Sequence, residues 1–257
     1  DVELINQDKL GFINEVKLMD KTSYKCDFIF DCSGFKRLIV GKLFKTPWVN
    51  YQKHLPMKKA VPFFLEQENE IYPCTHAIAM KYGWMWKIPL QHRFGAGYIY
   101  DSDYINEDQA LEEAQIFLKR KLQSPRVISF DAGRFKNVWV KNCIAVGLSA
   151  GFTEPLEATS LFITVQQLIL LSHFKEVLFN ASEGKRKNYN EIMGNSNDDI
   201  LDFLYFHYLT KRNDSKFWLD FKEKTKIPSG LEEKLENIKN NNFININFDF
   251  GKTYASF

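Results

Sequence analysis

The sequence predicts a mixed α/β fold, with α+β elements, on the basis of three observations. An apolar strand at residues 27–31 ends in the small-residue turn Cys32-Ser33-Gly34. A second apolar strand at residues 143–147 runs through a turn of Gly, Ser and Ala into a long helix. Between them, residues 60–105 alternate apolar and polar side chains, which indicates antiparallel strands. Strands that end in small-residue turns form the ligand edge of nucleotide-binding sheets.

The first elements follow from local signals. Residues 1–35 as a whole read as short strands with a turn at Asp20-Lys21. A helix is predicted over residues 106–122, because its first turn is acidic, at Glu107-Asp108, and its end is basic, at Lys119-Arg120-Lys121. Charges of these signs at the two ends suit the helix dipole.

The later elements are mostly helical. A strand at residues 138–140 is predicted next to the one at 143–147. Pro155, whose fixed φ suits a first helical position, opens the following helix, which is expected to reach about Phe179. Two further helices are expected, over residues 186–211 and 214–224.

Composition excludes several classes of protein. The formal net charge of +2 gives no basic field of the kind that binds nucleic acid. The longest apolar run, residues 161–171, is interrupted by Gln166-Gln167 and is too short to span a bilayer. The scattered cysteines and histidines predict neither a metal site nor a disulfide framework, and a reducing cytoplasm is the default. Aromatic residues make up 15% of the chain, which favours a flat, apolar cavity.

Trp84 and Trp86 are the rarest local feature, because they stand one residue apart just before Ile88-Pro89. In a strand, side chains two residues apart point to the same face. The two indoles are therefore expected to form one apolar wall, which can close a cavity or pack against a flat cofactor. A core pair is the alternative that the residues alone leave open.

The turn that begins at Gly147 is the second unusual feature. Gly147, Ser149, Ala150 and Gly151 let the backbone approach a flat ligand, and the carboxylate of Glu157 follows. Backbone amides in such a turn can bind an anion. A merely structural turn, with Glu157 as a favourable first-turn carboxylate, is equally open on the residues alone.

Together and in this order, these motifs resemble the flavin-dependent tryptophan halogenase family. The likeness covers roughly residues 20–225, and its most specific part is Trp-x-Trp-x-Ile-Pro at residues 84–89. The further matches are Asp-Cys-Ser-Gly-Phe at 31–35, Gly-Arg at 133–134, Trp-Val at 139–140, Asn-Cys at 142–143, Gly147, Glu-Pro-Leu-Glu with Thr at 154–159, His-Tyr at 207–208 and Phe-Trp at 217–218.

The resemblance implies the chemistry of these enzymes. Reduced FAD, delivered by a separate flavin reductase, reacts with oxygen to give a flavin hydroperoxide, which a bound halide such as chloride attacks to yield hypohalous acid. A lysine and a glutamate then direct this oxidant to an aromatic substrate, an indole or a phenol. The implied fold is a partial FAD-binding sheet module of the FAD/NAD(P)-binding type with a β-rich and helical substrate module.

Carried over residue by residue, the resemblance assigns the reacting groups. Glu157 matches the catalytic glutamate, which stabilises the cationic ring intermediate and accepts its proton. Thr159 and Ser160 match the residues whose backbone amides hold the halide. This halide site sets a geometric condition, because a regular helix that starts at Pro155 would already use those amides. The regular helix is therefore required to begin near Thr159.

Cofactor and substrate positions follow from the same matching. Gly147, Leu148 and Leu161 correspond to flavin-contacting positions, and Trp84 and Trp86 to the wall that keeps the substrate away from the flavin. The positions expected to contact the substrate are Phe206, His207, Asn213, Phe217 and Trp218.

The chain departs from the family pattern around these positions. Ala158 replaces a serine and Ser160 replaces a glycine, although the halide needs only backbone amides there. Members that act on free tryptophan carry neighbouring tyrosines and a glutamate before Phe-Trp, whereas Phe206-His207-Tyr208 and Asn213 occupy that stretch here. A substrate ammonium group thus loses its carboxylate partner unless Asp214 substitutes, so another indole or phenol fits at least as well as free tryptophan.

The family's Gly-x-Gly-x-x-Gly turn and its catalytic lysine find no match in the chain. Gly95-Ala96-Gly97 precedes strand-like residues rather than a helix. The chain therefore reads as a fragment, expected to be inactive alone. The expected modules are residues 1–40 with 136–180 for part of the FAD site, 41–135 as an inserted β-rich substrate module and 181–257 as a C-terminal helical substrate module.

Two alternatives remain open on the sequence. One is a flavin monooxygenase with the same fold and no working halide site. The other is a non-catalytic remnant that binds a partner or an aromatic ligand. The resemblance implies no nucleic-acid or membrane partner, and it allows a homodimer.

Overall fold

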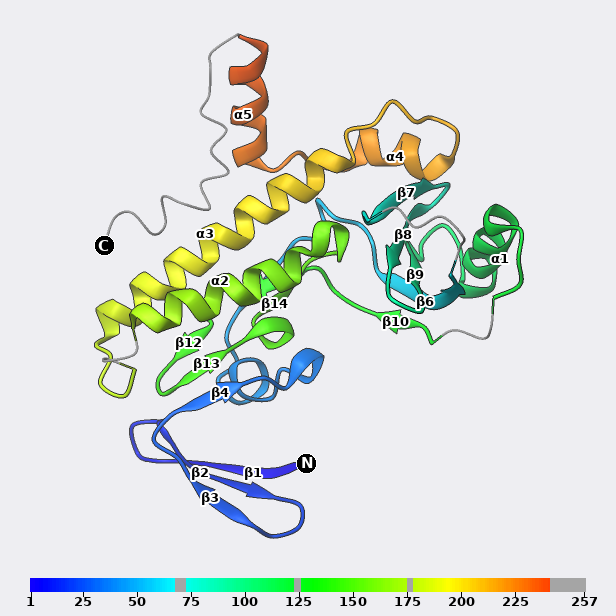
Figure 1. Cartoon of the computed structure of the whole chain (residues 1–257). Coiled ribbons are helices and arrows are strands. Elements are labelled where there is room, and N and C mark those ends of the chain that lie inside the picture. Colours follow the sequence, from blue (N-terminus) through cyan, green and yellow to red (C-terminus); the bar gives the residue numbers. More distant parts are fainter. Residues whose placement is uncertain (68–72, 123–125, 175–177, 241–257) are drawn as a thin grey trace.

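The structure is a computed structural model that describes residues 1–67, 73–122, 126–174 and 178–240. Within these residues the strands form four small sheets, and two long helices run side by side across the middle of the molecule (Figure 1). The predicted mixed α/β class is confirmed. The sheets and helices share one large apolar core, and a second, smaller core lies beneath a peripheral helix.

A three-stranded antiparallel sheet forms the N-terminal part, from β1 (Val2–Gln7), β2 (Ile13–Leu18) and β3 (Ser23–Lys25). The predicted turn at Asp20-Lys21 joins β2 to β3, with the Thr22 amide donating to Asp20 Oδ1 at 2.9 Å. The buried Asn142 ties this sheet to the core, because its side chain exchanges two hydrogen bonds with the backbone of Ile13 (2.7 and 2.9 Å). The first residues thus belong to the folded body.

A parallel pair of strands carries the two predicted small-residue turns at one edge. β4 (Ile29–Asp31) pairs in parallel with β13 (Cys143–Ala145), and β13 pairs antiparallel with β12 (Trp139–Val140). Parallel strands end at the same edge, so the turns after β4 and β13 meet there. The Gly34 amide donates to Ser149 Oγ at 2.8 Å and fixes one turn against the other.

The predicted antiparallel strands of residues 60–105 are confirmed as the main part of a five-stranded sheet, in the order β10-β6-β9-β8-β7. Its strands are β6 (Lys59–Glu66), β7 (His76–Met80), β8 (Gly83–Pro89), β9 (Arg93–Tyr100) and β10 (Ile128–Ser129). A small third sheet joins the two halves of the chain through β5 (Trp48–Asn50), β11 (Gly133–Phe135) and β14 (Gly151–Phe152).

Helix α1 (Glu107–Leu118) covers one face of the five-stranded sheet with Ala110 and Ala114. It begins at the capping box of Asn106 and Gln109, as the acidic first turn predicts. It ends four residues earlier than the predicted residue 122, because Lys119 takes a left-handed conformation and its amide bonds back to the last turn.

Four helices follow in the C-terminal half: α2 (Thr159–His173), α3 (Glu183–His207), α4 (Lys216–Lys224) and α5 (Ser229–Lys239). The two helices predicted over 186–211 and 214–224 are confirmed with shifted ends. The prediction that α2 starts at Pro155 and reaches Phe179 is wrong at both ends. α5 was not predicted from the sequence.

Helix α2 divides into an inner and an outer face. On the inner face Gln167 is fully buried, and its amide donates to the carbonyl of Ala145 at 2.6 Å. Gln167, one of the two glutamines that interrupt the apolar run, therefore anchors the helix to the end of β13. On the outer face Leu161, Val165 and Leu168 are 71%, 54% and 52% exposed. An apolar strip thus lies on the surface of the described chain.

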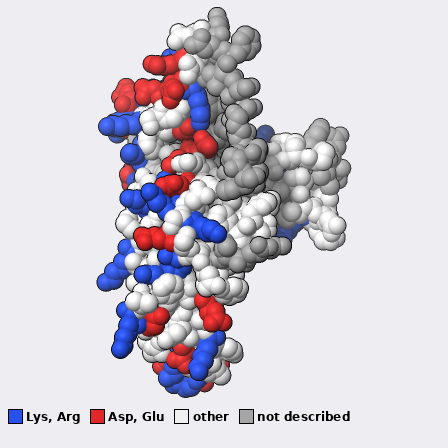
Figure 2. All heavy atoms as spheres, turned by 90° about the vertical axis from the view of Figure 1, so that its left-hand side faces the viewer, with Lys and Arg blue, Asp and Glu red and all other residues white. Residues whose placement is uncertain are grey.

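The charged residues show no single-sign field on the face drawn in Figure 2. Lys and Arg are interspersed there with Asp and Glu, in keeping with a net charge of +2. No helix among the described residues is both long enough and apolar enough to cross a membrane.

Candidate active site

The segment between β14 and α2 contains the predicted catalytic residue. A short turn of 3-10 helix ends in two successive left-handed residues, Glu157 (φ +57°) and Ala158 (φ +53°), before α2 begins at Thr159. Left-handed backbone at a residue other than glycine is uncommon and costs on the order of 1 kcal/mol. Such outliers gather at functional sites. The helix start near Thr159 is the geometry that the halide site requires.

The turn places the predicted catalytic carboxylate next to the predicted halide-binding residues. Glu157 is solvent-exposed. Thr159 and Ser160 stand in the first turn of α2, where backbone amides have no acceptor within the helix and the dipole is positive. The side chain of Thr159 donates to the carbonyl of Glu154 at 3.2 Å. Ser160 Oγ is buried and has no hydrogen-bond partner among the described residues.

Glu154 is a buried carboxyl group that the sequence analysis missed as a site residue. It is 0% exposed, and its Oε2 accepts a hydrogen bond from the Trp84 indole at 2.9 Å and another from the Tyr208 hydroxyl. Burial raises the pKa of Glu154 to about 7, against the lowering effect of these two bonds. Glu154 belongs to the Glu-Pro-Leu-Glu motif, but no local signal in the sequence distinguishes it from the exposed Glu157.

A small aromatic cavity of about 130 Å³ lies on the other side of these two donors. Its walls are Ala77, Ala79, Trp84, Leu156, His207, Tyr208, Thr210 and Trp218. Known small-molecule sites range from about 300 to 1,000 Å³, so this cavity is small for such a site. The indole of Trp218 is fixed by donating to the carbonyl of Met80 at 2.8 Å.

The cavity brings together only some of the positions expected to contact the substrate. His207 and Trp218 line it, together with Trp84, which was expected in the flavin-side wall. Phe206 is 52% exposed and Asn213 is also exposed, and neither belongs to the cavity wall. Phe217 lies in the core against Tyr104, with ring centroids 5.6 Å apart, because consecutive residues on α4 point about 100° apart.

The two tryptophans of the signature share one face of β8, as predicted. Their rings meet edge to face with centroids 6.2 Å apart. Trp84 is buried and lines the cavity, whereas Trp86 is half-buried and lies over Gly97 of β9. A Cβ atom at Gly97 would lie 2.1 Å from the Trp86 ring, so only glycine leaves room for this indole.

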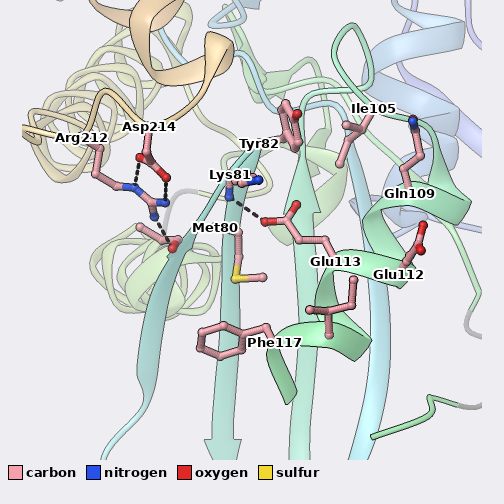
Figure 3. A pocket seen from close by; sticks show the side chains of 12 residues that line it. Met80, Lys81, Tyr82, Ile105, Gln109, Glu112, Glu113, Phe117, Arg212 and Asp214 are labelled. Atoms are coloured by element: carbon pink, nitrogen blue, oxygen red, sulfur yellow. Dashed lines mark hydrogen bonds and ion pairs between the residues drawn. The ribbon is translucent and has the colours of Figure 1, made fainter. Parts of the chain in front are cut away.

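An ion pair lies against the free edge of β7 (Figure 3). It contacts the edge at Ala79, which also lines the cavity. Arg212 meets Asp214 through two hydrogen bonds of 2.9 and 2.6 Å, and a third from its guanidinium reaches the carbonyl of Ala79. This pairing lowers the pKa of Asp214 to about 2. Asp214, the residue considered as partner for a substrate ammonium group, is therefore already occupied. The pair also forms part of the wall of a larger hollow of about 640 Å³, which Met80 and Phe117 line as well.

The predicted flavin positions occupy the edge where the parallel strands end. Gly147 has φ +63°, a conformation that favours glycine, and begins the turn that contains Leu148. A Cβ atom built on Gly34, in the facing turn, would meet nothing within 4 Å. The open, small-residue edge therefore fits a flat ring approached by backbone. Leu161 lies in the first turn of α2, with its side chain 71% exposed.

A family model described as tryptophan halogenase matches residues 1–254. The tryptophan 7-halogenase KtzQ of Kutzneria sp. (strain 744) is 37% identical over 236 residues, which are 89% of this chain and 44% of KtzQ.

Two solved structures have the same fold over nearly all of the chain. The tryptophan 6-halogenase SttH from Streptomyces toxytricini superposes with a TM-score of 0.85 at 33% identity, covering 93% of this chain and 48% of SttH. BrvH, a flavin-dependent halogenase from Brevundimonas sp. BAL3, superposes with a TM-score of 0.83 at 32% identity, covering 92% and 48%. The chain spans about half the length of the relatives it matches.

Proposed function

The chain belongs to the tryptophan halogenase family, and from this we propose that its protein is a flavin-dependent halogenase of a small aromatic substrate. The observation that carries the proposal is the pair of left-handed residues, Glu157 and Ala158, immediately before α2. That break leaves an exposed carboxylate next to helix amides that are free to bind an anion.

In the proposed reaction, Glu157 acts as the catalytic carboxylate. It stabilises the positive charge on the attacked ring and then accepts the proton that leaves. The amides of Thr159 and Ser160 hold the halide at the start of α2, where the helix dipole favours a negative charge. Ala158 takes its left-handed conformation without a side-chain cap, so the absence of a serine hydroxyl leaves this backbone path intact.

The open edge at the ends of β4 and β13 is the proposed flavin site. Gly147 and Leu148 would hold the isoalloxazine, together with Leu161 at the start of α2. When bound, reduced FAD supplies with oxygen and halide the hypohalous acid that attacks the substrate. Trp84 and Trp86 form the wall between this edge and the substrate, and Trp84 fixes that wall to the core through its bond to Glu154.

The substrate that we propose is an indole or phenol without a charged amino-acid group. Trp84, His207, Tyr208 and Trp218 surround the cavity with aromatic faces, and no carboxylate of the described residues lines it. The nearby Asp214 is held by Arg212. Free tryptophan would bring an ammonium group into this region without a free carboxylate to meet it.

The proposed partner is a separate flavin reductase that delivers reduced FAD. The four cysteines are unpaired, which is consistent with work in the cytoplasm. We propose that residues 1–40 and 136–180 form part of the FAD-binding module. Residues 41–135 would form the β-rich substrate module, and residues 181–257 the C-terminal helical substrate module.

The test is a reaction of the full protein with FAD, a flavin reductase, NADH, oxygen and bromide, on a panel of small indoles and phenols. Mass spectrometry should find a brominated product that disappears in Glu157→Gln and persists in Glu236→Gln, an exposed carboxylate on α5. Hydroxylated product without bromine would instead assign a monooxygenase. Bound flavin with neither product across the panel would refute the proposed reaction.

A further inference from the structure

Glu154 joins parts of the site that are far apart in the sequence. Its Oε2 accepts hydrogen bonds from Trp84, 70 residues earlier on β8, and from Tyr208, 54 residues later at the end of α3. Both donors belong to side chains that line the aromatic cavity. One carboxylate oxygen therefore fixes two walls of the cavity at the same time.

The backbone of the same residue is part of the catalytic loop. The carbonyl of Glu154 accepts the hydrogen bond from Thr159 Oγ1, and Thr159 Oγ1 also lies 3.4 Å from Thr153 Oγ1. Thr153, Glu154 and Thr159 are all at most 5% exposed. Glu157 lies inside the loop that these contacts close. Glu154 thus touches the substrate walls with its side chain and the start of α2 with its backbone.

We propose that Glu154 is a positioning residue, which holds Trp84 and Tyr208 in register with the loop that carries Glu157. The inference rests on the proposed function, in which the cavity receives the aromatic ring and Glu157, next to the cavity-lining Leu156, acts on it. Without the shared acceptor, the two walls and the loop would each be free to shift. A displacement of about 1 Å in such a site can cost on the order of a hundredfold in rate.

The surroundings explain why this carboxyl acts as an acceptor and not as a partner in an ion pair. Burial raises the pKa of Glu154, the hydrogen bonds from the Tyr208 hydroxyl and the Trp84 indole lower it, and no cation among the described residues contributes. Three other titratable groups lie around this pair. His207 lines the same cavity, and Glu157 is exposed to solvent. The charge of Asp101 raises the pKa of Tyr208 from a distance. Oε1 of Glu154 has no partner among the described residues, so a proton can reside there while Oε2 keeps both bonds.

The first experiment measures the binding of indole by calorimetry. Glutamine at position 154 keeps an oxygen that accepts both donors, so Glu154→Gln should retain affinity within about threefold. Glu154→Leu removes the acceptor and should weaken binding by about tenfold or more. Glu236→Gln, a change to an exposed carboxylate on α5, should bind indole as the wild type does. Equal affinity of wild type and a folded Glu154→Leu would overturn the proposal.

A second variant covers the case in which Glu154→Leu does not fold. Tyr208→Phe removes one donor and keeps the ring, and it should weaken indole binding several-fold. Tyr205→Phe is the matched control, because this buried hydroxyl of α3 bonds the carbonyl of Thr225 and lies outside the cavity. If the two tyrosine variants bind indole equally well, the assignment fails.

A spectroscopic titration separates positioning from a merely structural role. Glu154 accepts the hydrogen bond of the Trp84 indole, so its titration should change the near-ultraviolet circular dichroism of that indole. In the wild type, the midpoint of this change should lie near pH 7. Glu154→Gln should abolish this change, and Trp218→Phe should leave its midpoint unaltered. A titration that persists in Glu154→Gln would contradict the inference. Neither readout needs turnover, so a reaction assay without halogenated product would reject the proposed function separately.

Discussion

The hydroxyl of Thr159 donates a hydrogen bond to the backbone carbonyl of Glu154, at 3.2 Å, and thereby closes the loop that presents Glu157. The N-cap residue of α2 is Ala158, whose methyl side chain cannot accept a hydrogen bond from the first helical amides. The bond from Thr159 takes the place of such a cap. The start of the helix is therefore held by its first residue.

Replacing Thr159 by valine should open this loop. We expect the free energy of unfolding to fall by about 1 kcal/mol, the usual net value of one such bond. The KM for bromide should rise several-fold with little change in kcat, because the amides of Thr159 and Ser160 lose their fixed direction. Urea unfolding followed by circular dichroism and rates at varied bromide concentration measure the two effects.

Thr164→Val is the control for this substitution. Thr164 also sits on α2, and its hydroxyl donates at 2.8 Å to Ser160, one helical turn earlier. It should leave the bromide dependence within error of the wild type. An unchanged KM for bromide in Thr159→Val would contradict the role that we give to the loop.

The stability of the protein should depend on pH through Glu154. The folded state raises its pKa from 4.5 to about 7, so folding favours the protonated form. The stability that the protonated carboxyl of Glu154 contributes is fully present below pH 4.5. It is lost as the pH rises through about 7, and the total loss in the free energy of unfolding is on the order of 3 kcal/mol. The difference between wild type and Glu154→Gln in urea unfolding should therefore grow in favour of the glutamine from pH 5 to pH 8. A constant difference would show that Glu154 titrates normally.

Gly97→Ala should destabilise the five-stranded sheet. The added methyl group would lie 2.1 Å from the Trp86 ring, and overpacking of this kind typically costs about 1 to 3 kcal/mol. Gly95→Ala on the same strand is the control, because its Cβ would meet Leu90 at an ordinary 3.5 Å. Thermal unfolding followed by circular dichroism should show a loss of stability in Gly97→Ala and none in Gly95→Ala. The loss should shrink when Trp86 is also replaced by leucine.

The ion pair at the edge of β7 should determine how the protein treats charged substrates. In the wild type, tryptamine should bind no better than indole, because Arg212 already occupies Asp214. Arg212→Ala frees that carboxylate and should raise the ratio of tryptamine to indole affinity two- to fivefold, the size of an exposed ion pair. Calorimetry with both ligands checks this. The gain should vanish in the double variant with Asp214→Asn, and tight binding of tryptamine to the wild type would refute the explanation.

Local patterns in the sequence were sufficient for much of the fold. The two apolar strands with small-residue ends were predicted, because a strand of that kind needs no distant partner to be recognised. The spacing of Trp84 and Trp86 predicted their common face for the same reason. The parallel pairing of the two strands became visible only in the structure. The interruption of the apolar run by Gln167 excluded a membrane span, and its role as an anchor for β13 became visible only in the structure.

The rest depended on contacts between distant residues. Pro155 favours a helix start, but the left-handed turn at Glu157 and Ala158 moves the start to Thr159, and no local preference of these residues predicts that turn. The burial of Glu154 depends on Trp84 and Tyr208, which the sequence does not place together. Phe217 and Trp218 look equivalent as aromatic neighbours, and only the docking of α4 decides which one faces the cavity.

The outer face of α2 affects how the folded chain behaves with hydrophobic probes. Leu161, Val165 and Leu168 remain in contact with solvent on successive turns of the described structure. A fluorescent dye that brightens on apolar surfaces would therefore bind before any unfolding begins, and its signal on heating would start high and report on this strip. The helical circular dichroism signal has no such offset, so the two signals should give different apparent melting temperatures for the same sample.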